Sequence, residues 1–551
     1  MLRRGVLSRV TIFIAVSCSA TISFAQHANT KILWTPITFT ERANIRFEGQ
    51  AALFAIDDES LPWTRGVELH MVPPEKYPNN PVLARSEEGK FNFPLADSPS
   101  VILENGKWRM WYVVGVDHNP RHSRIAYAES DDGINWIKPK LGLVEFNGNK
   151  DNNFVDAQPG VGYGAAVIVD SAAPPERRYV MAGEDMRYWA ESGAWTLNSY
   201  KSVTRIDISA DGLYWKPLRE GPGIIKQQHE VSTIYRFNGY YHIGGHQISP
   251  LLKLPLQEHA LGSWLGPRTF VVWRSPRPDV WPVEHTKAFY QPMRSSSPYR
   301  TGWDREEVHL GASVTPFGNV CIGIYGQWHH PINERAPRYS ADKVSVDLGL
   351  LISNDGLHFR EPAQGYTFIE RDQELSWDRE HADAAKANIL LIQGSMLNHG
   401  KKTYIYYSAS TAGGNVSGVY ANIGLAQLDR DRFGFLKAIP GTAGGGQVVS
   451  CPLKVDGPVE LVANVDVPRG SSVSIGLMDE NALSMIDNYK PHEQQSAMVS
   501  GLDSKVAWKD KTLLPTHLTF RVRVDMQGNA KLYTLYLRPV VNRDDRILQE
   551  N

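Results

Sequence analysis

The chain has 551 residues and nearly balanced charge, with 58 lysine and arginine side chains against 59 aspartate and glutamate. This balance leaves no basic field for nucleic acid, and the length favours two domains over one. The 15 tryptophans and 23 tyrosines are a high aromatic load. Sugar-binding surfaces and the packing between β-sheets both use such rings, so composition alone does not separate these two roles.

The N-terminus has the pattern of a secretion signal. Three arginines, Arg3, Arg4 and Arg9, precede a short apolar stretch over residues 10–16, and an Ala-x-Ala-like cleavage site ends at Ala25. We therefore predict a signal peptide over residues 1–25 and a secreted or periplasmic protein. The apolar stretch is too short for a permanent membrane anchor, and no other apolar run reaches membrane length.

The three cysteines give little support for a disulfide scaffold. Cys18 follows Ala15-Val16-Ser17 in a lipoprotein-like box that lacks its usual leucine, so lipid anchoring stays open as an alternative. After processing only Cys321 and Cys451 remain, and whether they pair is left open. No cysteine–histidine spacing typical of a metal site occurs.

A seven-residue motif, Ser-x-Asp-Gly-x-x-aromatic, recurs along the chain. Asp-Gly makes a tight turn because glycine accepts a positive φ and aspartate bonds its own backbone, and the aromatic ring is then expected to pack between sheets. One such turn is common in any β-protein, but repeats at near-regular long spacing predict a radial β-architecture, a β-propeller. The copies start at Ser130, Ser209 and Ser353, with a worn copy at Ser275.

Strand-like runs around these motifs fall into five units, which predict five blades of four strands over residues 26–440. Hairpin turns such as Asn105-Gly106 and Asn238-Gly239 separate strands within the units. How the first and last strands close cannot be seen in the sequence. The units cover residues 100–128, 165–212, 233–243, 309–325 and 389–426.

The character of the chain changes after Gly441. Residues 441–446 predict a flexible junction, and the segments beyond it alternate apolar and polar residues with period two. About 100 residues suit one antiparallel β-sandwich, which we predict over residues 441–551. We expect this domain to support the propeller, with carbohydrate binding as the alternative.

Acidic residues just before the innermost strands of a propeller are the first candidates for chemistry, because those strands converge on one axial pocket. Asp97 stands in Leu95-Ala96-Asp97-Ser98-Pro99, ahead of a strand and the Asn105-Gly106 turn. Glu230 stands in His229-Glu230-Val231-Ser232-Thr233, ahead of a strand and the Asn238-Gly239 turn.

These two runs resemble the five-bladed β-propeller glycoside hydrolases of the arabinanase/xylosidase group (family 43) and the invertase-like group (family 32), as a divergent branch. The resemblance covers roughly residues 80–435, and the C-terminal sandwich is similar to the family 32 plan. It implies that Asp97 is the base or nucleophile and that Glu230 is the general acid. The family has Ala-Asp-Pro-Ser-Val around this aspartate, whereas this chain has one extra residue, Ser98, between Asp97 and Pro99. Glycosidic cleavage needs this pairing of one ionised and one protonated carboxyl group.

No cofactor is required by this chemistry, although a structural cation in the axial channel is left open. The distance between the two carboxyl groups decides inversion or retention, and the sequence does not give it. The sugar, exo or endo action and the oligomeric state are equally open.

The second blade departs from the family pattern. The family carries an aspartate there, whereas this chain has Gly162-Tyr163-Gly164-Ala165 at the expected place. Asp156, upstream in a loop, is the candidate substitute; Asp170 fits a turn better.

Further candidates stand at the ends of other predicted strands. Glu307 and His309 are two apart, so on a strand they share a face. With His246, Trp328 and His329 they are candidate sugar ligands.

Three other functions compete with the hydrolase. A non-catalytic glycan-binding propeller would explain the missing acid of the second blade. A sialidase-type propeller fits less well, because its Asp-box has different spacing and no arginine triad is found. A propeller phosphorylase for mannosides would need a phosphate-binding basic cluster, which the sequence lacks.

Overall fold

The computed structural model describes most of the chain between residues 36 and 540. The predicted signal peptide, including Cys18, lies outside the described residues. Within them the regular structure is β-strand, apart from short 3-10 helices at Pro120–His122, Pro175–Arg177 and Pro491–Glu493. The predicted all-β class is therefore confirmed. The described ranges are 36–40, 45–84, 97–116, 120–185, 203–219, 230–248, 268–281, 287–290, 308–329, 345–371, 388–391, 395–411 and 421–540.

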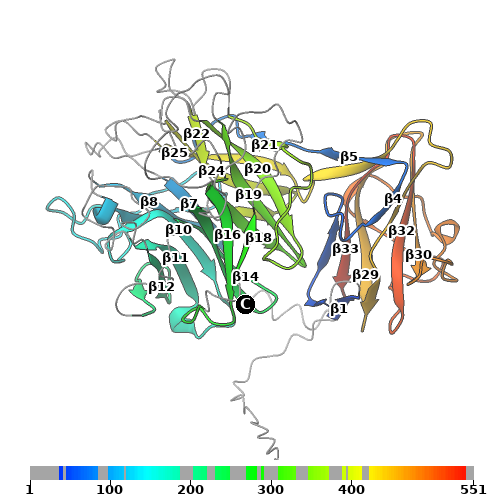
Figure 1. The fold of residues 1–551 in the computed structure, drawn as a ribbon, viewed down its shortest axis with the longest axis horizontal. Helices are drawn as coiled ribbons and strands as arrows, with labels where there is room; N and C mark the ends of the chain where they lie inside the picture. The colour runs from blue at the N-terminus through cyan, green and yellow to red at the C-terminus, as the bar shows by residue number, and fades with distance from the viewer. Residues whose placement is uncertain are drawn as a thin grey trace, which may run out of the picture. The chain divides into compact units, whose positions relative to one another are not determined.

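Three antiparallel sheets follow one another along the first half of the chain (Figure 1). Strands that are consecutive in sequence are neighbours in each sheet, as short hairpin connections require. In each sheet the strand that comes first in the chain lies at one side. Sheet one contains β7 (Asp97–Glu104), β8 (Lys107–Val114) and β9 (Arg124–Ser130); sheet two contains β10 (Val161–Val169), β11 (Tyr179–Asp185), β12 (Val203–Ser209) and β13 (Lys216–Pro217); sheet three contains β14 (Glu230–Phe237), β15 (Tyr240–Ile248), β16 (Arg268–Ser275) and β17 (Lys287–Tyr290).

A nine-stranded sheet follows and joins two groups of strands through one parallel pair, Val346 opposite Ile389. Its edge strand β6 comes from the chain before sheet one and pairs with β25. Backbone hydrogen bonds thus tie the beginning of this region to its end. The strands are β18 (Val308–Phe317), β19 (Val320–His329), β20 (Ser345–Ser353), β21 (Thr367–Ile369), β22 (Asn388–Leu391), β23 (Met396–His399), β24 (Lys402–Thr411), β25 (Ala421–Asp429) and β6 (Glu75–Lys76).

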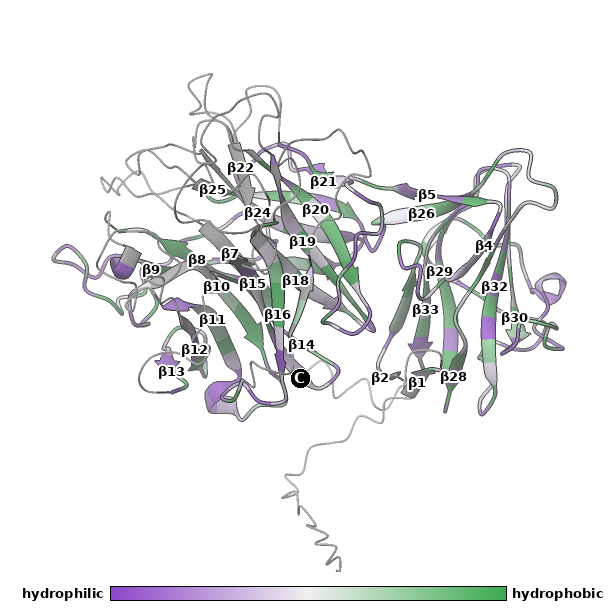
Figure 2. Ribbon diagram, in the orientation of Figure 1, coloured by the Kyte–Doolittle hydropathy of each residue, from purple (hydrophilic) through white to green (hydrophobic). Residues whose placement is uncertain are grey.

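Two further sheets hold the C-terminal strands and enclose an apolar core of their own. Figure 2 shows the hydrophobic residues along strands such as β29 and β33. The sequence predicted both segments as strands, but burial along them is nearly continuous rather than alternating with period two. The larger sheet contains β1 (Pro36–Phe39), β2 (Ile45–Glu48), β4 (Trp63–Arg65), β27 (Gly446–Val449), β28 (Leu453–Val455), β30 (Ser472–Asp479) and β32 (Thr519–Gln527); the smaller contains β3 (Ala51–Phe54), β5 (Val67–Met71), β26 (Gly434–Ala438), β29 (Val459–Asp466), β31 (Gly501–Lys505) and β33 (Lys531–Pro539).

The membership of these two sheets differs from the predicted division at residue 441. Strands β1, β3 and β4, which the sequence assigned to the propeller region of residues 26–440, pair with strands beyond residue 441. Strand β2 joins the same sheet through β1, and β5 joins the smaller sheet through β26. Ile37, for example, lies opposite Val455, and Leu53 lies opposite Leu535. Because the paired strands are hundreds of residues apart in the chain, no local sequence pattern could predict their pairing.

The Asp-Gly motifs form the predicted turns. At the first motif the Asp132 carboxylate accepts hydrogen bonds from the backbone N–H groups of Ile134 and Asn135, both at 2.8 Å, and Gly133 has φ of 74°. The same bonds recur at Asp211 and Asp355. Glycine is required because an L-residue at this φ is strained.

Each motif glycine also receives a hydrogen bond from an aromatic side chain of a different sheet. Trp111 of β8 donates its indole N–H to the Gly212 carbonyl at 2.7 Å. The hydroxyls of Tyr406 in β24 and Tyr235 in β14 donate to the carbonyls of Gly133 and Gly356, both at 2.6 Å. The repeated motif therefore links neighbouring groups of strands, which is a stronger role than the aromatic packing that the sequence predicts.

No helix in the described parts of the chain is long and apolar enough to span a membrane. Cys321 and Cys451 are both buried and form no disulfide. These two cysteines therefore do not pair with each other.

A buried histidine makes the stability of sheet three sensitive to acid. His242 is fully buried and stacks on Tyr235 at 4.8 Å between ring centroids. Burial, aided by the charge of Arg274, lowers the pKa of His242 to about 3, while Asp355 opposes the shift. The folded protein therefore binds fewer protons than the unfolded chain between the ordinary histidine pKa and this value, so stability is lost as the pH falls below about 6.5.

We expect His242→Phe to remove this dependence while keeping a stacked ring. Between pH 6.5 and pH 5 the wild-type protein should lose about 2 kcal/mol more unfolding free energy than the variant, at about 1.4 kcal/mol per pH unit. Urea denaturation at the two pH values measures the difference, with the exposed His492→Phe as the control. Equal losses in wild type and His242→Phe would refute the assignment.

Candidate functional site

The first strands of four groups share an irregularity close to their beginnings. Each of β7, β10, β14 and β18 breaks its register with the next strand within its first five residues. Such bulges bend a strand and re-aim side chains, and they are over-represented next to active sites. The breaks lie between Asp97 and Ser100, Gly162 and Ala165, Val231 and Thr233, and His309 and Ala312.

Register places these starts and the motif turns at opposite ends of the sheets. Asp97 pairs with Val113 near the end of β8, whereas the Asp-Gly turn follows the end of β9. Glu230 at the start of β14 likewise pairs with His246 near the end of β15. We call the end formed by the beginnings of β7, β10, β14 and β18 the strand-start edge.

Short hydroxyl side chains hold the first strands to one another. The Ser100 hydroxyl of β7 accepts a hydrogen bond from the Val167 N–H of β10 at 2.9 Å. The Ser232 hydroxyl of β14 donates to the Ala312 carbonyl of β18 at 2.8 Å. Ser395, just before β23, accepts from the Val101 N–H of β7 at 3.0 Å. Strands β10 and β14 also lie in contact, so the first strands form a connected row.

The two predicted catalytic residues occupy corresponding positions in this row. Asp97 is the first residue of β7, and Glu230 is the first residue of β14. His246, directly opposite Glu230, is buried. The structure thus assigns both acids to the strand-start edge, two first strands apart.

The remaining predicted sugar ligands fall on or near β18 and β19. His309 is the second residue of β18 and pairs with Gly326, while Trp328 pairs with Val346. Glu307 lies outside the described residues, directly before β18. His329 is the last residue of β19, opposite Ser345.

His329 belongs to a polar cluster that sequence reasoning did not find. Its ring Nε2 lies 2.9 Å from the carboxylate of Asp347, which also accepts hydrogen bonds from the backbone N–H of Arg371 at 2.7 Å and its guanidinium at 3.0 Å. Burial alone would raise the pKa of Asp347, but the bonds from His329 and Arg371 outweigh it and hold that pKa below its usual range. An ionised Asp347 can orient the His329 ring.

Buried charged residues also stand at the strand-start edge of sheet two. Glu184 and Asp185 end β11, directly opposite Gly162 and Val161, and both are buried. Arg205 of β12 pairs with Asp207 in the same sheet. These carboxyl groups could not be predicted, because they lie on a second strand rather than before a first one.

Asp156, the predicted substitute for the acid of the second blade, is exposed and lies beside the second motif. Its N–H donates to the Leu213 carbonyl at 2.9 Å, and its carbonyl accepts from the Trp215 N–H at 2.7 Å. These bonds attach it to the turn that follows β12 rather than to the start of β10. The structure does not bring it together with the starts of β7 and β14.

Comparisons with known proteins give distant structural matches only. No protein-family model matches the chain, and no curated protein matches it. A glycosyl hydrolase from Bacteroides ovatus matches with 17% identity over 66% of this chain and 95% of its own, at a TM-score of 0.41. A glycoside hydrolase of the GH130 family of mannoside phosphorylases, which targets β-1,2-mannosidic linkages in Candida mannan, has the same identity and coverages with a TM-score of 0.40. The GH32 β-fructofuranosidase of Bombyx mori matches over 86% of this chain and 94% of its own, with 10% identity and a TM-score of 0.34. Glycoside hydrolases, the class that the sequence resembles, are thus among the solved structures matched.

Proposed function

We propose that this chain is a secreted or periplasmic glycoside hydrolase whose active site lies at the strand-start edge. The observation that carries the proposal is the matching position of Asp97 and Glu230, each the first residue of a bulged first strand. Acid–base cleavage of a glycosidic bond requires two carboxyl groups, and this edge supplies one from β7 and one from β14.

We further propose that the strands of residues 75–429 form a five-bladed propeller, with the two C-terminal sheets as a β-sandwich. The links between successive groups of strands support this arrangement. Trp111 joins sheet one to the motif of sheet two, Tyr406 joins β24 to the motif of sheet one, and β6 pairs with β25. Two of these links, Tyr406 to the first motif and β6 to β25, connect the last group of strands with the beginning of the region, as a closed propeller requires.

In the proposed mechanism Glu230 donates its proton to the oxygen of the leaving sugar as the glycosidic bond breaks. Asp97, ionised, either attacks the anomeric carbon or takes a proton from the water that does so. The products are two free sugar ends, and the proton balance closes with one water consumed. This chemistry needs no cofactor.

The polar cluster at the end of β19 would serve binding rather than bond cleavage. His329, held by Asp347, can donate or accept a hydrogen bond with a sugar hydroxyl, and His246 stands opposite the proposed acid. Carbohydrate is the partner that this mixture of donors and acceptors suits. Because Asp156 is attached to the second motif, we assign it no role in the reaction.

Product release from a broad glycan panel by the chain from Gln26 onward tests the proposal. We expect Glu230→Gln and Asp97→Asn each to abolish most turnover, while Glu480→Gln, which replaces an exposed carboxyl in the turn after β30, changes nothing. Full activity in both variants would mean that Asp97 and Glu230 are not the catalytic residues.

One observation favours a second candidate, a glycan-binding protein without turnover. The first strand of sheet two begins with Val161-Gly162-Tyr163-Gly164, which contains no acid. Glycan binding without product release from any member of the panel would support this candidate over the hydrolase.

A further inference from the structure

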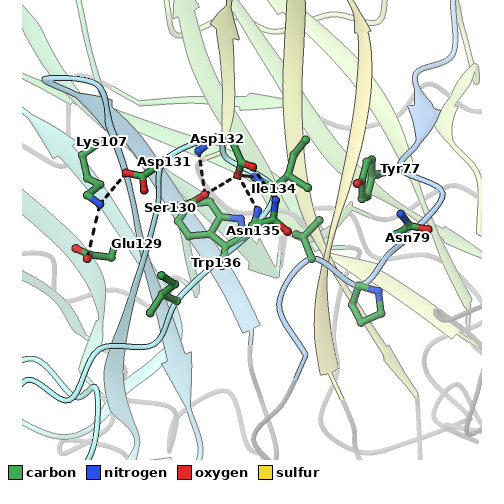
Figure 3. A pocket seen from close by; sticks show the side chains of 13 residues that line it. Tyr77, Asn79, Lys107, Glu129, Ser130, Asp131, Asp132, Ile134, Asn135 and Trp136 are labelled. Carbon is green, nitrogen blue, oxygen red and sulfur yellow. Dashed lines mark hydrogen bonds and ion pairs between the residues drawn. The ribbon is translucent and has the colours of Figure 1, made fainter.

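The described residues line an open cavity at the end of sheet one opposite the strand-start edge. Its volume is about 480 Å³, within the range of ligand pockets. Figure 3 shows Lys107 and Glu129 on one side, and Tyr77 and Asn79 on the other, with the first Asp-Gly motif between them. Nothing in the proposed hydrolase chemistry uses these groups.

One wall is the first motif turn, which is held rigidly. The Ser130 hydroxyl accepts a hydrogen bond from the Gly133 N–H at 3.0 Å, and the Asn135 amide donates to the Asp132 carboxylate at 2.7 Å. The Trp136 indole N–H donates to the Gly133 carbonyl at 3.2 Å. A wall fixed in this way loses little entropy when a ligand binds.

The opposite wall is the segment that joins β6 to sheet one, and backbone bonds fix it as well. The Tyr77 N–H donates to the Leu425 carbonyl at 2.8 Å. The Asn80 side chain bonds both the carbonyl and the N–H of Leu425, each at 2.9 Å. The cavity therefore lies between two preformed walls from segments about fifty residues apart in the chain.

Charge at the cavity is negative overall. Lys107 lies 2.9 Å from Asp131 and 3.8 Å from Glu129. Burial is the largest single influence on the pKa of Asp132 and raises it, but the hydrogen bonds from Asn135, Ile134 and Ser130 together outweigh burial and lower that pKa to about 2, so Asp132 is ionised. One cation against three carboxylates disfavours an acidic ligand.

The other lining groups suit a hydroxyl-rich neutral ligand. Tyr77 and Trp136 supply aromatic rings, and Asn79 and Asn135 supply both amide donors and amide acceptors. Ile137 stands beside them and is 63% exposed. Rings next to paired donors and acceptors match the alternating apolar faces and hydroxyls of a sugar.

We propose that this cavity is a second glycan-binding site, selective for neutral over acidic oligosaccharides. The eight residues of β7 separate it from the strand-start edge by roughly 25 Å along the strand, so one long glycan or two separate ones could occupy both places. The site goes beyond the proposed hydrolase function, and its ligand binding does not depend on turnover.

Isothermal titration calorimetry on the Asp97→Asn, Glu230→Gln double variant tests the site without turnover. The probes are neutral gluco-, manno-, xylo- and fructo-hexasaccharides, with oligogalacturonate as the acidic counterpart. We expect at least one neutral probe to bind, and Ile137→Glu or Lys107→Ala, added separately, to weaken its Kd about tenfold or more by blocking the rim or removing a donor.

Val280→Glu is the matched control, since it adds the same charge at a 51% exposed apolar residue of the worn motif. The double variant that also carries Val280→Glu should bind the neutral probe with the same Kd as the double variant alone. Three outcomes would refute the proposed second site. These are binding that neither Ile137→Glu nor Lys107→Ala weakens, equal affinity for oligogalacturonate and the neutral probes, and no binding of any probe. Turnover by the wild-type chain, measured separately, decides the hydrolase, so the two proposals can fail independently.

Discussion

Glu230→Gln is expected to lower kcat/KM on a natural glycan by about 10² to 10⁴, because the leaving sugar then departs without a proton. The loss should depend on the leaving group. An aryl glycoside whose phenol departs readily as an anion needs little protonation, so it should retain far more of its wild-type rate in the variant. A pure binding role for Glu230 would instead penalise both substrates alike and would appear mainly in KM.

The measurement is a pair of steady-state comparisons, wild type against Glu230→Gln, on a natural oligosaccharide and on a nitrophenyl glycoside of the same sugar. Asp97→Asn supplies the contrast, because a base or nucleophile is needed whatever the leaving group. Equal losses on both substrates in Glu230→Gln would remove the general-acid assignment.

Gly212→Ala is expected to cost about 2–5 kcal/mol of unfolding free energy. The φ of Gly212 is 80°, where an L-residue is strained by about 1–2 kcal/mol. An added Cβ would also stand 2.6 Å from the Trp111 ring, whose N–H bonds the Gly212 carbonyl, and overpacking of this kind costs about 1–3 kcal/mol.

Gly239→Ala separates these two contributions. Gly239 has φ of 79°, but nothing lies within 4 Å of its added Cβ. Chemical denaturation should therefore show the backbone cost alone at Gly239 and a clearly larger loss at Gly212. Equal losses of unfolding free energy in Gly212→Ala and Gly239→Ala would mean that the contact between Trp111 and the Gly212 turn does not contribute to stability.

Local chemistry explains why the motif turns could be predicted. The hydrogen bonds of the turn join residues within a few positions of one another, as at Ser130, Asp132 and Gly133. A short stretch of sequence is therefore enough to predict the turn. The aromatic ring at the end of the motif packs as expected, with Trp136 edge-on to Tyr406 at 5.8 Å. The same locality made the Asn238-Gly239 hairpin visible, since both residues take positive φ there.

Long-range pairing explains what could not be predicted. Strand β3 joins β33 across most of the chain, and β6 finds β25 only in the folded protein. At the candidate site, Asp97 and Glu230 were visible because each precedes a recognisable strand. Asp347 was not, because its partners His329 and Arg371 come from separate segments.

The most direct test of a shared active site is the kcat/KM of the double variant Asp97→Asn, Glu230→Gln beside the two single variants. Residues that act in one reaction give strongly non-additive losses. We predict that the double variant falls only to about the level of the more damaged single variant. Losses that multiply, as for independent sites, would contradict the proposal that the starts of β7 and β14 build one catalytic centre.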